Sequence, residues 1–172
     1  MTTPSHALTV DAGSRDLRAA DHLIQRLAAE LALPEDVFGC THLVRGDRPR
    51  VAVSFAFRSG AERDAVRDRL TARGYGVAPG VPDDTGRAVR YPGAAALTGT
   101  LTVAELLARS AITRVTVLGA PGAPDPGTPV VTADHVRPQW QRGDLVLTAQ
   151  PASGGTLVPF EVPDPTPCCA DH

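Results

Sequence analysis

The residue types best suited to chemistry gather at the C-terminus, in Cys168-Cys169-Ala170-Asp171-His172. Cys169 and His172 are three positions apart, a spacing that lets a thiolate and an imidazole bind one tetrahedral metal ion. Cys168 adds a second thiol, but two adjacent thiolates have an awkward bite on a single ion. Because these residues cannot fill a coordination shell alone, we expect further ligands from elsewhere in the chain.

A second pair of metal-binding residue types, Cys40 and His42, lies in a predicted strand. Residues two apart in a strand point to the same face, so this thiol and imidazole can converge on one ion. Together with the C-terminal residues they would form a soft nitrogen and sulfur site suited to Zn²⁺ or Cu(I), with His135 in reserve. The first functional hypothesis is therefore a soft transition metal, Zn or Cu, bound as a structural, sensing or carrier site.

The same C-terminal cysteines also permit a redox or sulfur-transfer hypothesis. Vicinal cysteines can close a strained and labile disulfide, and His172 can lower the thiol pKa of Cys169 by ion pairing. Residues 163–167 have proline at every second position, which predicts a stiff, extended arm. In layout this arm resembles the C-terminal swinging arms of small sulfur-transfer proteins. The alternative is a buried, inert Cys40 and a disordered terminus.

Other candidate motifs are incomplete. Ser153-Gly154-Gly155 lacks the flanks of a nucleophile elbow, and Gly119-Ala120-Pro121-Gly122 lacks the Lys-Ser/Thr of a phosphate-binding loop. Asp134-His135 are neighbours in sequence only, and Asp83-Asp84 are typical of a solvated turn. Whether the chain is an enzyme stays open, with a non-enzyme slightly favoured. A third hypothesis is a non-catalytic scaffold for a protein partner or a homo-oligomer.

Composition narrows the classes of partner. The 172-residue chain has a net charge of −2, and all 17 of its basic residues are arginine. This charge argues against nucleic-acid binding, although Arg45, Arg48 and Arg50 form a dense basic stretch at a predicted turn. The sequence shows neither a signal peptide nor an apolar run long enough to cross a bilayer, and three cysteines do not fit a disulfide framework. We expect a cytoplasmic protein without a membrane partner.

Hydrophobic periodicity and turn residues predict an α+β protein. In the first half, Ser14 is the expected N-cap of the first helix, and Ser59 with Glu62 has capping-box spacing for the second. The expected elements are a strand at 6–11, a helix at 14–33, a hairpin of 37–44 with 51–57, a helix at 59–73, and an extended stretch near 75–78 or 88–91. This βαββαβ order is ferredoxin-like, an arrangement that hosts many unrelated functions.

The second half is expected to be mostly β-structure with one short helix. The expected elements are a helix at 102–110, opened by a Thr102/Glu105 capping box, and strands at 112–118, 130–132, 145–149 and 156–162. The chain then divides into a ferredoxin-like unit at 1–92, a β-rich unit at 93–162 sharing its core, and a proline-rich arm at 163–172.

Overall fold

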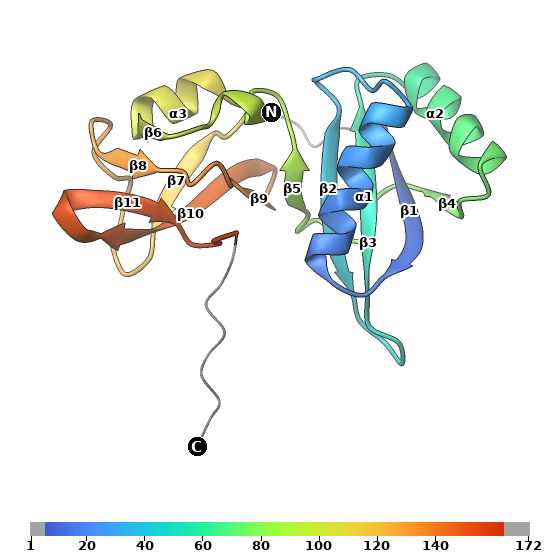
Figure 1. The fold of residues 1–172 in the computed structure, drawn as a ribbon, viewed down its shortest axis with the longest axis horizontal. Coiled ribbons are helices and arrows are strands. Elements are labelled where there is room, and N and C mark those ends of the chain that lie inside the picture. The colour runs from blue at the N-terminus through green and yellow to red at the C-terminus, as the bar shows by residue number, and fades with distance from the viewer. Residues whose placement is uncertain (1–5, 164–172) are drawn as a thin grey trace.

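The computed structural model describes residues 6–163, which form one large mixed sheet and three α-helices (Figure 1). The helices are α1 (Leu17–Glu30), α2 (Gly60–Ala72) and α3 (Val103–Arg109). The strands are β1 (His6–Ser14), β2 (Phe38–Val44), β3 (Arg50–Phe57), β4 (Val77–Pro79), β5 (Arg87–Arg90), β6 (Thr100–Thr102), β7 (Arg114–Val117), β8 (Pro129–Val131), β9 (Gln139–Gln141), β10 (Asp144–Ala152) and β11 (Thr156–Pro159). None of the described helices is both long and apolar enough to span a membrane.

The first lobe consists of β1 to β4 with α1 and α2. Its strands lie in the order β4-β1-β3-β2, and every neighbouring pair is antiparallel. Apolar residues of both helices, such as Ile24 and Leu70, pack with Val53 and Phe55 of β3 in one buried cluster. Both helices therefore cover the same face of this part of the sheet, as Figure 1 shows for α1.

The start of α1 differs from the sequence-based expectation. Ser14 is not the N-cap, because β1 continues to Ser14; instead the Asp16 side chain accepts a hydrogen bond from Ala19 N at 2.8 Å. The strand is longer because it bulges: Val10 pairs with Val53, but the next paired residue, Ser14, lies opposite Val51. A bulge places extra residues on one strand, and here residues 11–13 of β1 have no paired residue in β3.

The other two predicted helix starts are confirmed. The Ser59 hydroxyl accepts a hydrogen bond from Glu62 N at 3.2 Å, and Thr102 with Glu105 forms a complete capping box. The predicted hairpin is also confirmed as β2 and β3, joined by the turn that carries the basic stretch. These features depend on residues close in sequence, which is why local patterns predicted them.

A crossing segment, residues 80–86, covers the face of the first lobe opposite its helices. It joins β4, beside β1, to β5, beyond β2, so it must pass over three strands. Gly80 N donates to Ala7 O at 2.9 Å, and Thr9 Oγ1 donates to Gly80 O at 2.8 Å. These bonds fix the start of the crossing segment, and His42 fixes its middle.

The second lobe continues the same sheet through β5, β9, β10, β11, β8 and β6, while β7 runs parallel to β10. Its core also takes in Phe38 and Cys40 of β2. Trp140, on a strand that the sequence did not predict, packs against Phe38 with ring centroids 5.4 Å apart. The two lobes thus share both a sheet and part of a core.

Candidate functional site

Cys40 lies on β2 beside His42, and both side chains face the crossing segment. A Cβ built on Gly86 would meet His42 Cε1 at 2.8 Å and Cys40 Cβ at 3.1 Å. Burial raises the pKa of the Cys40 thiol to about 12, which a hydrogen bond with Trp140 offsets only in part. The thiol is therefore protonated at neutral pH, whereas metal binding needs the thiolate.

Both ring nitrogens of His42 already have partners. Nδ1 lies 3.1 Å from Asp83 Oδ1, and Nε2 lies 2.7 Å from Ser54 Oγ. A carboxylate only accepts, so we assign the proton to Nδ1, which leaves Nε2 to accept from the Ser54 hydroxyl. Burial raises the pKa of Asp83, but the hydrogen bonds from His42 and from Thr85 N lower it by more. The net result is a pKa below its ordinary value.

The order carboxylate, imidazole, hydroxyl is that of serine hydrolases, yet its position here is unsuited to catalysis. Ser54 is only 3% exposed, in the middle of β3, and His42 is 4% exposed. A nucleophile must reach its substrate, and this hydroxyl lies beneath the crossing segment. The two hydrogen bonds that link Asp83, His42 and Ser54 therefore hold the crossing segment against the sheet.

The other half of the predicted metal site, Cys168, Cys169 and His172, lies outside the described residues. Within residues 6–163, no three His, Cys, Asp or Glu side chains are placed to hold a metal ion. The reserve ligand His135 instead contacts Glu161, with Nε2 3.0 Å from Oε1. The metal site stays a prediction.

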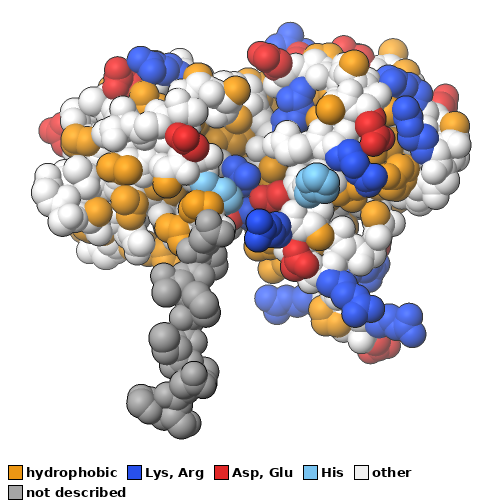
Figure 2. Space-filling model, viewed as in Figure 1, with side chains coloured by type: hydrophobic (Ala, Val, Ile, Leu, Met, Phe, Trp, Pro, Cys, Tyr) orange, Lys and Arg blue, Asp and Glu red, His pale blue; other side chains and the backbone are white. Residues whose placement is uncertain are grey.

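A charge network that the sequence did not predict joins the two lobes. Arg87 of β5, only 7% exposed, donates through Nη1 and Nη2 to both carboxylate oxygens of Asp21, at 2.6 and 3.0 Å. It also donates through Nε to Glu161 Oε2 at 2.7 Å. Arg137 Nε donates to Asp21 Oδ2 at 3.2 Å. Figure 2 shows acidic, basic and histidine side chains together in the furrow between the lobes.

The network balances its own charge, because two guanidinium groups face two carboxylates. Burial lowers the pKa of Arg87, but its hydrogen bonds to Glu161 and Asp21 raise it more, so the net shift is upward. Burial raises the pKa of Glu161, but Arg87 and His135 lower it below its ordinary value. Since each charge is already paired, the network is suited to holding α1 against β5 and the second lobe.

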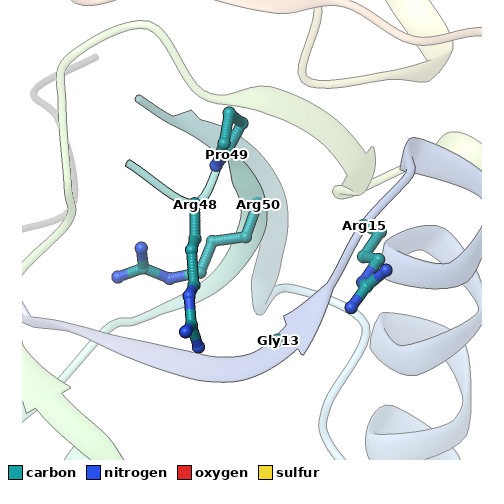
Figure 3. Close-up of a pocket in the computed structure, with 5 residues that line it drawn as sticks. All are labelled: Gly13, Arg15, Arg48, Pro49 and Arg50. Carbon is teal, nitrogen blue, oxygen red and sulfur yellow. The ribbon is translucent and has the colours of Figure 1, made fainter. Parts of the chain in front are cut away.

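A different concentration of charge lies at the base of the β2–β3 turn. Gly13, Arg15, Arg48, Pro49 and Arg50 line a cavity of about 480 Å³, here called the arginine cavity (Figure 3). Figure 3 shows Arg48 and Arg50 on one side of the β1 strand at Gly13 and Arg15 on the other. The bulge makes this arrangement possible, because Gly13 adopts a φ of +70° that favours glycine.

The arginine cavity, unlike the network, carries unbalanced charge. Arg50 Nε donates to Asp11 Oδ2, but Arg15 and Arg48 form no ion pair with any residue in 6–163. The basic stretch of the turn was visible in the sequence. Arg15 was not associated with it, because the β1 bulge that brings them together has no local sequence signal.

No protein-family model, curated protein or solved structure matches this chain.

Proposed function

We propose that this chain is a non-catalytic binding protein that holds an anionic group of its ligand in the arginine cavity. One observation carries the proposal: three guanidinium groups line a single cavity, and one carboxylate, Asp11, faces one of them. The net charge of the whole chain is −2, so this positive charge is a local feature.

The guanidinium group suits this role because its planar fork of donors matches the oxygens of a carboxylate or phosphate. A single exposed ion pair contributes little, so useful affinity needs several donors converging on one ligand. The cavity volume of about 480 Å³ lies within the range of about 300–1,000 Å³ usual for small-ligand sites. Together these properties support recognition of a small anion or of an anionic group on a larger partner.

The other reactive groups support a non-catalytic role. Ser54 and His42 are sealed beneath the crossing segment, and Cys40 is buried and protonated. All three contribute to packing or to hydrogen bonds within the fold. None of these three groups is therefore exposed as a nucleophile or base that a substrate could reach.

Replacing both unpaired arginines, Arg15→Gln with Arg48→Gln, is expected to weaken anion binding at least about tenfold, since two charge-assisted contacts are lost. Isothermal titration calorimetry with sulfate and methyl phosphate at low ionic strength measures the effect. The control is Arg73→Gln with Arg114→Gln, which removes the same charge from exposed positions outside the cavity. Equal losses in both double variants, or no binding by the unmodified protein, would overturn the proposal.

For the fold, we also propose that the first lobe is ferredoxin-like and that the second is mostly β-structure. The antiparallel order β4-β1-β3-β2, with two helices packed on one face, supports the first statement. The domain limits at 92 and 162 stay predictions. A ferredoxin-like lobe is a scaffold on which a binding site can be built, and it implies no particular ligand.

A second proposal is that the C-terminal arm, residues 163–172, binds Zn or Cu through Cys168, Cys169 and His172. The supporting observation is where the arm begins: Glu161 bonds to Arg87, whose Nη1 lies 3.3 Å from Thr41 Oγ1, between Cys40 and His42. Ten residues of extended chain span about 30 Å, enough to reach the other face of β2. Use of Cys40 and His42 as ligands would require the thiol to ionise and His42 to release a partner.

This second proposal predicts metal in the purified protein. We expect close to one equivalent of zinc or copper by atomic emission, and its loss in a Cys168→Ser, Cys169→Ser, His172→Ala variant. A Cys40→Ala variant tests the body ligand separately, because the arm is intact in it. Metal content unchanged by the triple substitution, or absent from the unmodified protein after zinc or copper is supplied, would contradict the proposal.

A further inference from the structure

We infer that the arginine cavity selects a dianionic tetrahedral oxyanion, the terminal phosphate of a phosphomonoester, and that Asp11 is a built-in counter-charge that limits its affinity. This inference rests on the proposed function, since it names the class of ligand and the control of the same site.

The charge count of the site favours a dianion. Three guanidinium groups line the cavity, and the Asp11 carboxylate beside it pairs with that of Arg50, so the four side chains together carry two net positive charges. A phosphomonoester carries a charge of about −1.5 to −2 at neutral pH, whereas a carboxylate carries −1. A dianion therefore neutralises the cavity, and a carboxylate leaves it positive.

The donor arrangement also favours a tetrahedral group. In Figure 3 the guanidinium groups come from both sides of the β1 strand rather than from one plane. A phosphate has three terminal oxygens pointing in different directions, so it can accept from donors on several sides. A planar carboxylate presents two oxygens in one plane, which suits a single guanidinium fork.

Asp11 is fixed in place by the bulge of β1. Its Oδ1 accepts a hydrogen bond from Gly13 N at 3.1 Å, and its Oδ2 accepts from Arg50 Nε. The carboxylate thus engages only one edge of the guanidinium, and Arg50 Nη1 and Nη2 have no hydrogen-bond partner within residues 6–163. These nitrogens stay available to a ligand while Asp11 remains beside them.

The Asp11–Arg50 pair is accessible to solvent, with side chains 36% and 40% exposed, respectively. A ligand in the cavity meets a donor in Arg50, and the negative charge of Asp11, which does not itself line the cavity, lies next to that guanidinium. Coulomb repulsion grows with the product of the charges, so Asp11 opposes a dianion twice as strongly as a monoanion. Removing this charge should strengthen dianion binding more than monoanion binding.

The test is calorimetry on the full-length protein and on an Asp11→Asn variant, whose side-chain oxygen can still accept from Gly13 N. The probes are methyl phosphate, sulfate and acetate. We expect Asp11→Asn to tighten sulfate binding about tenfold and acetate binding about threefold. An Asp144→Asn variant, which removes one charge at the start of β10, is the control and should leave both unchanged.

A change of pH alters the charge of a phosphomonoester but leaves its tetrahedral shape unchanged. A phosphomonoester loses its second charge below a pKa of about 6, while sulfate stays dianionic. Between pH 8 and pH 5 we expect methyl phosphate to bind several-fold more weakly and sulfate to bind equally well. Asp11 stays ionised over this range: burial raises its pKa, but the hydrogen bonds from Arg50 and Gly13 N and the charge of Arg50 together lower it more, so its pKa lies below the ordinary 3.8. A guanidinium group keeps its charge at these pH values.

The outcomes distinguish the proposed anion-binding function from the assignment of a dianion. If the unmodified protein binds no probe, the proposed anion-binding function fails. If it binds acetate as tightly as methyl phosphate at pH 8, or if Asp11→Asn leaves sulfate binding unchanged, the anion site stands and the dianion assignment with its counter-charge is overturned.

Discussion

Replacing Arg87 with methionine is expected to lower the free energy of unfolding by about 3–5 kcal/mol at neutral pH. Methionine keeps much of the side-chain volume but removes the charge that faces two carboxylates. Among the described residues, Asp21 then keeps only the ion pair with Arg137, and Glu161 keeps only its contact with His135. A partly buried carboxylate without its partner costs several kcal/mol, far more than an exposed ion pair contributes.

The pH dependence of this loss has a definite sign. Arg87 holds the folded-state pKa of Glu161 below its ordinary 4.5, even though burial raises it. A group with a lowered folded-state pKa contributes stability above its unfolded pKa, and this contribution disappears as pH falls through the folded value. The unmodified protein therefore loses stability below about pH 4.5. The Arg87→Met variant lacks the part of this contribution that comes from Arg87, while the part from His135 remains. The difference between the two proteins should therefore shrink as the pH is lowered.

Urea unfolding of both proteins at pH 7 and at about pH 3.5 checks the magnitude and the sign. The matched control is Arg67→Met on the exposed face of α2, where Arg67 pairs with Asp64. That variant should lose less than about 1 kcal/mol. A similar loss in both variants, or a difference that widens in acid, would show that the Arg87 network does not hold the lobes together.

The features predicted correctly from sequence share one property: their determinants lie within a few residues of each other. Ser59 and Glu62 define the start of α2, and the Gly and Asp residues between two apolar runs define the β2–β3 turn. The start of α1 was wrong by two residues because its N-cap depends on where β1 ends. That end is set by a bulge against β3, and pairing with a distant strand leaves no trace in a local pattern.

The candidate sites were harder to predict for the same reason. Arg87 lies 66 residues from Asp21 and 74 from Glu161, and Asp83 lies 41 from His42. The strand period places Cys40 and His42 on one face, but it says nothing of the crossing segment that buries them. Burial raises the pKa of the Cys40 thiol, and Asp83 and Ser54 occupy both ring nitrogens of His42. The availability of a predicted ligand therefore depends on tertiary structure.

Replacing Gly93 with alanine should be more disruptive than any other glycine substitution of comparable backbone geometry. Gly93 joins β5 to the turn at Ala94–Ala96 and has a φ of +82°. A Cβ there would lie 2.0 Å from the Arg109 carbonyl oxygen and 2.6 Å from Ser110 Cα. Both obstacles are backbone atoms at the end of α3, which cannot rotate away as a side-chain tip can.

Gly122 provides the matched control, because its φ is +81° but a Cβ built there meets nothing within 4 Å. Alanine costs both positions about 1–2 kcal/mol for the left-handed conformation. At Gly93 the second lobe must also shift to relieve the overlap, which we expect to add about 3 kcal/mol. Urea unfolding of the two variants measures the difference, and equal losses would contradict the close contact between Gly93 and α3. The arginine cavity lies in the first lobe. Any Gly93→Ala protein that remains folded should therefore bind sulfate with unchanged affinity. A loss of sulfate binding in that protein would show that a change in the second lobe is transmitted to the first.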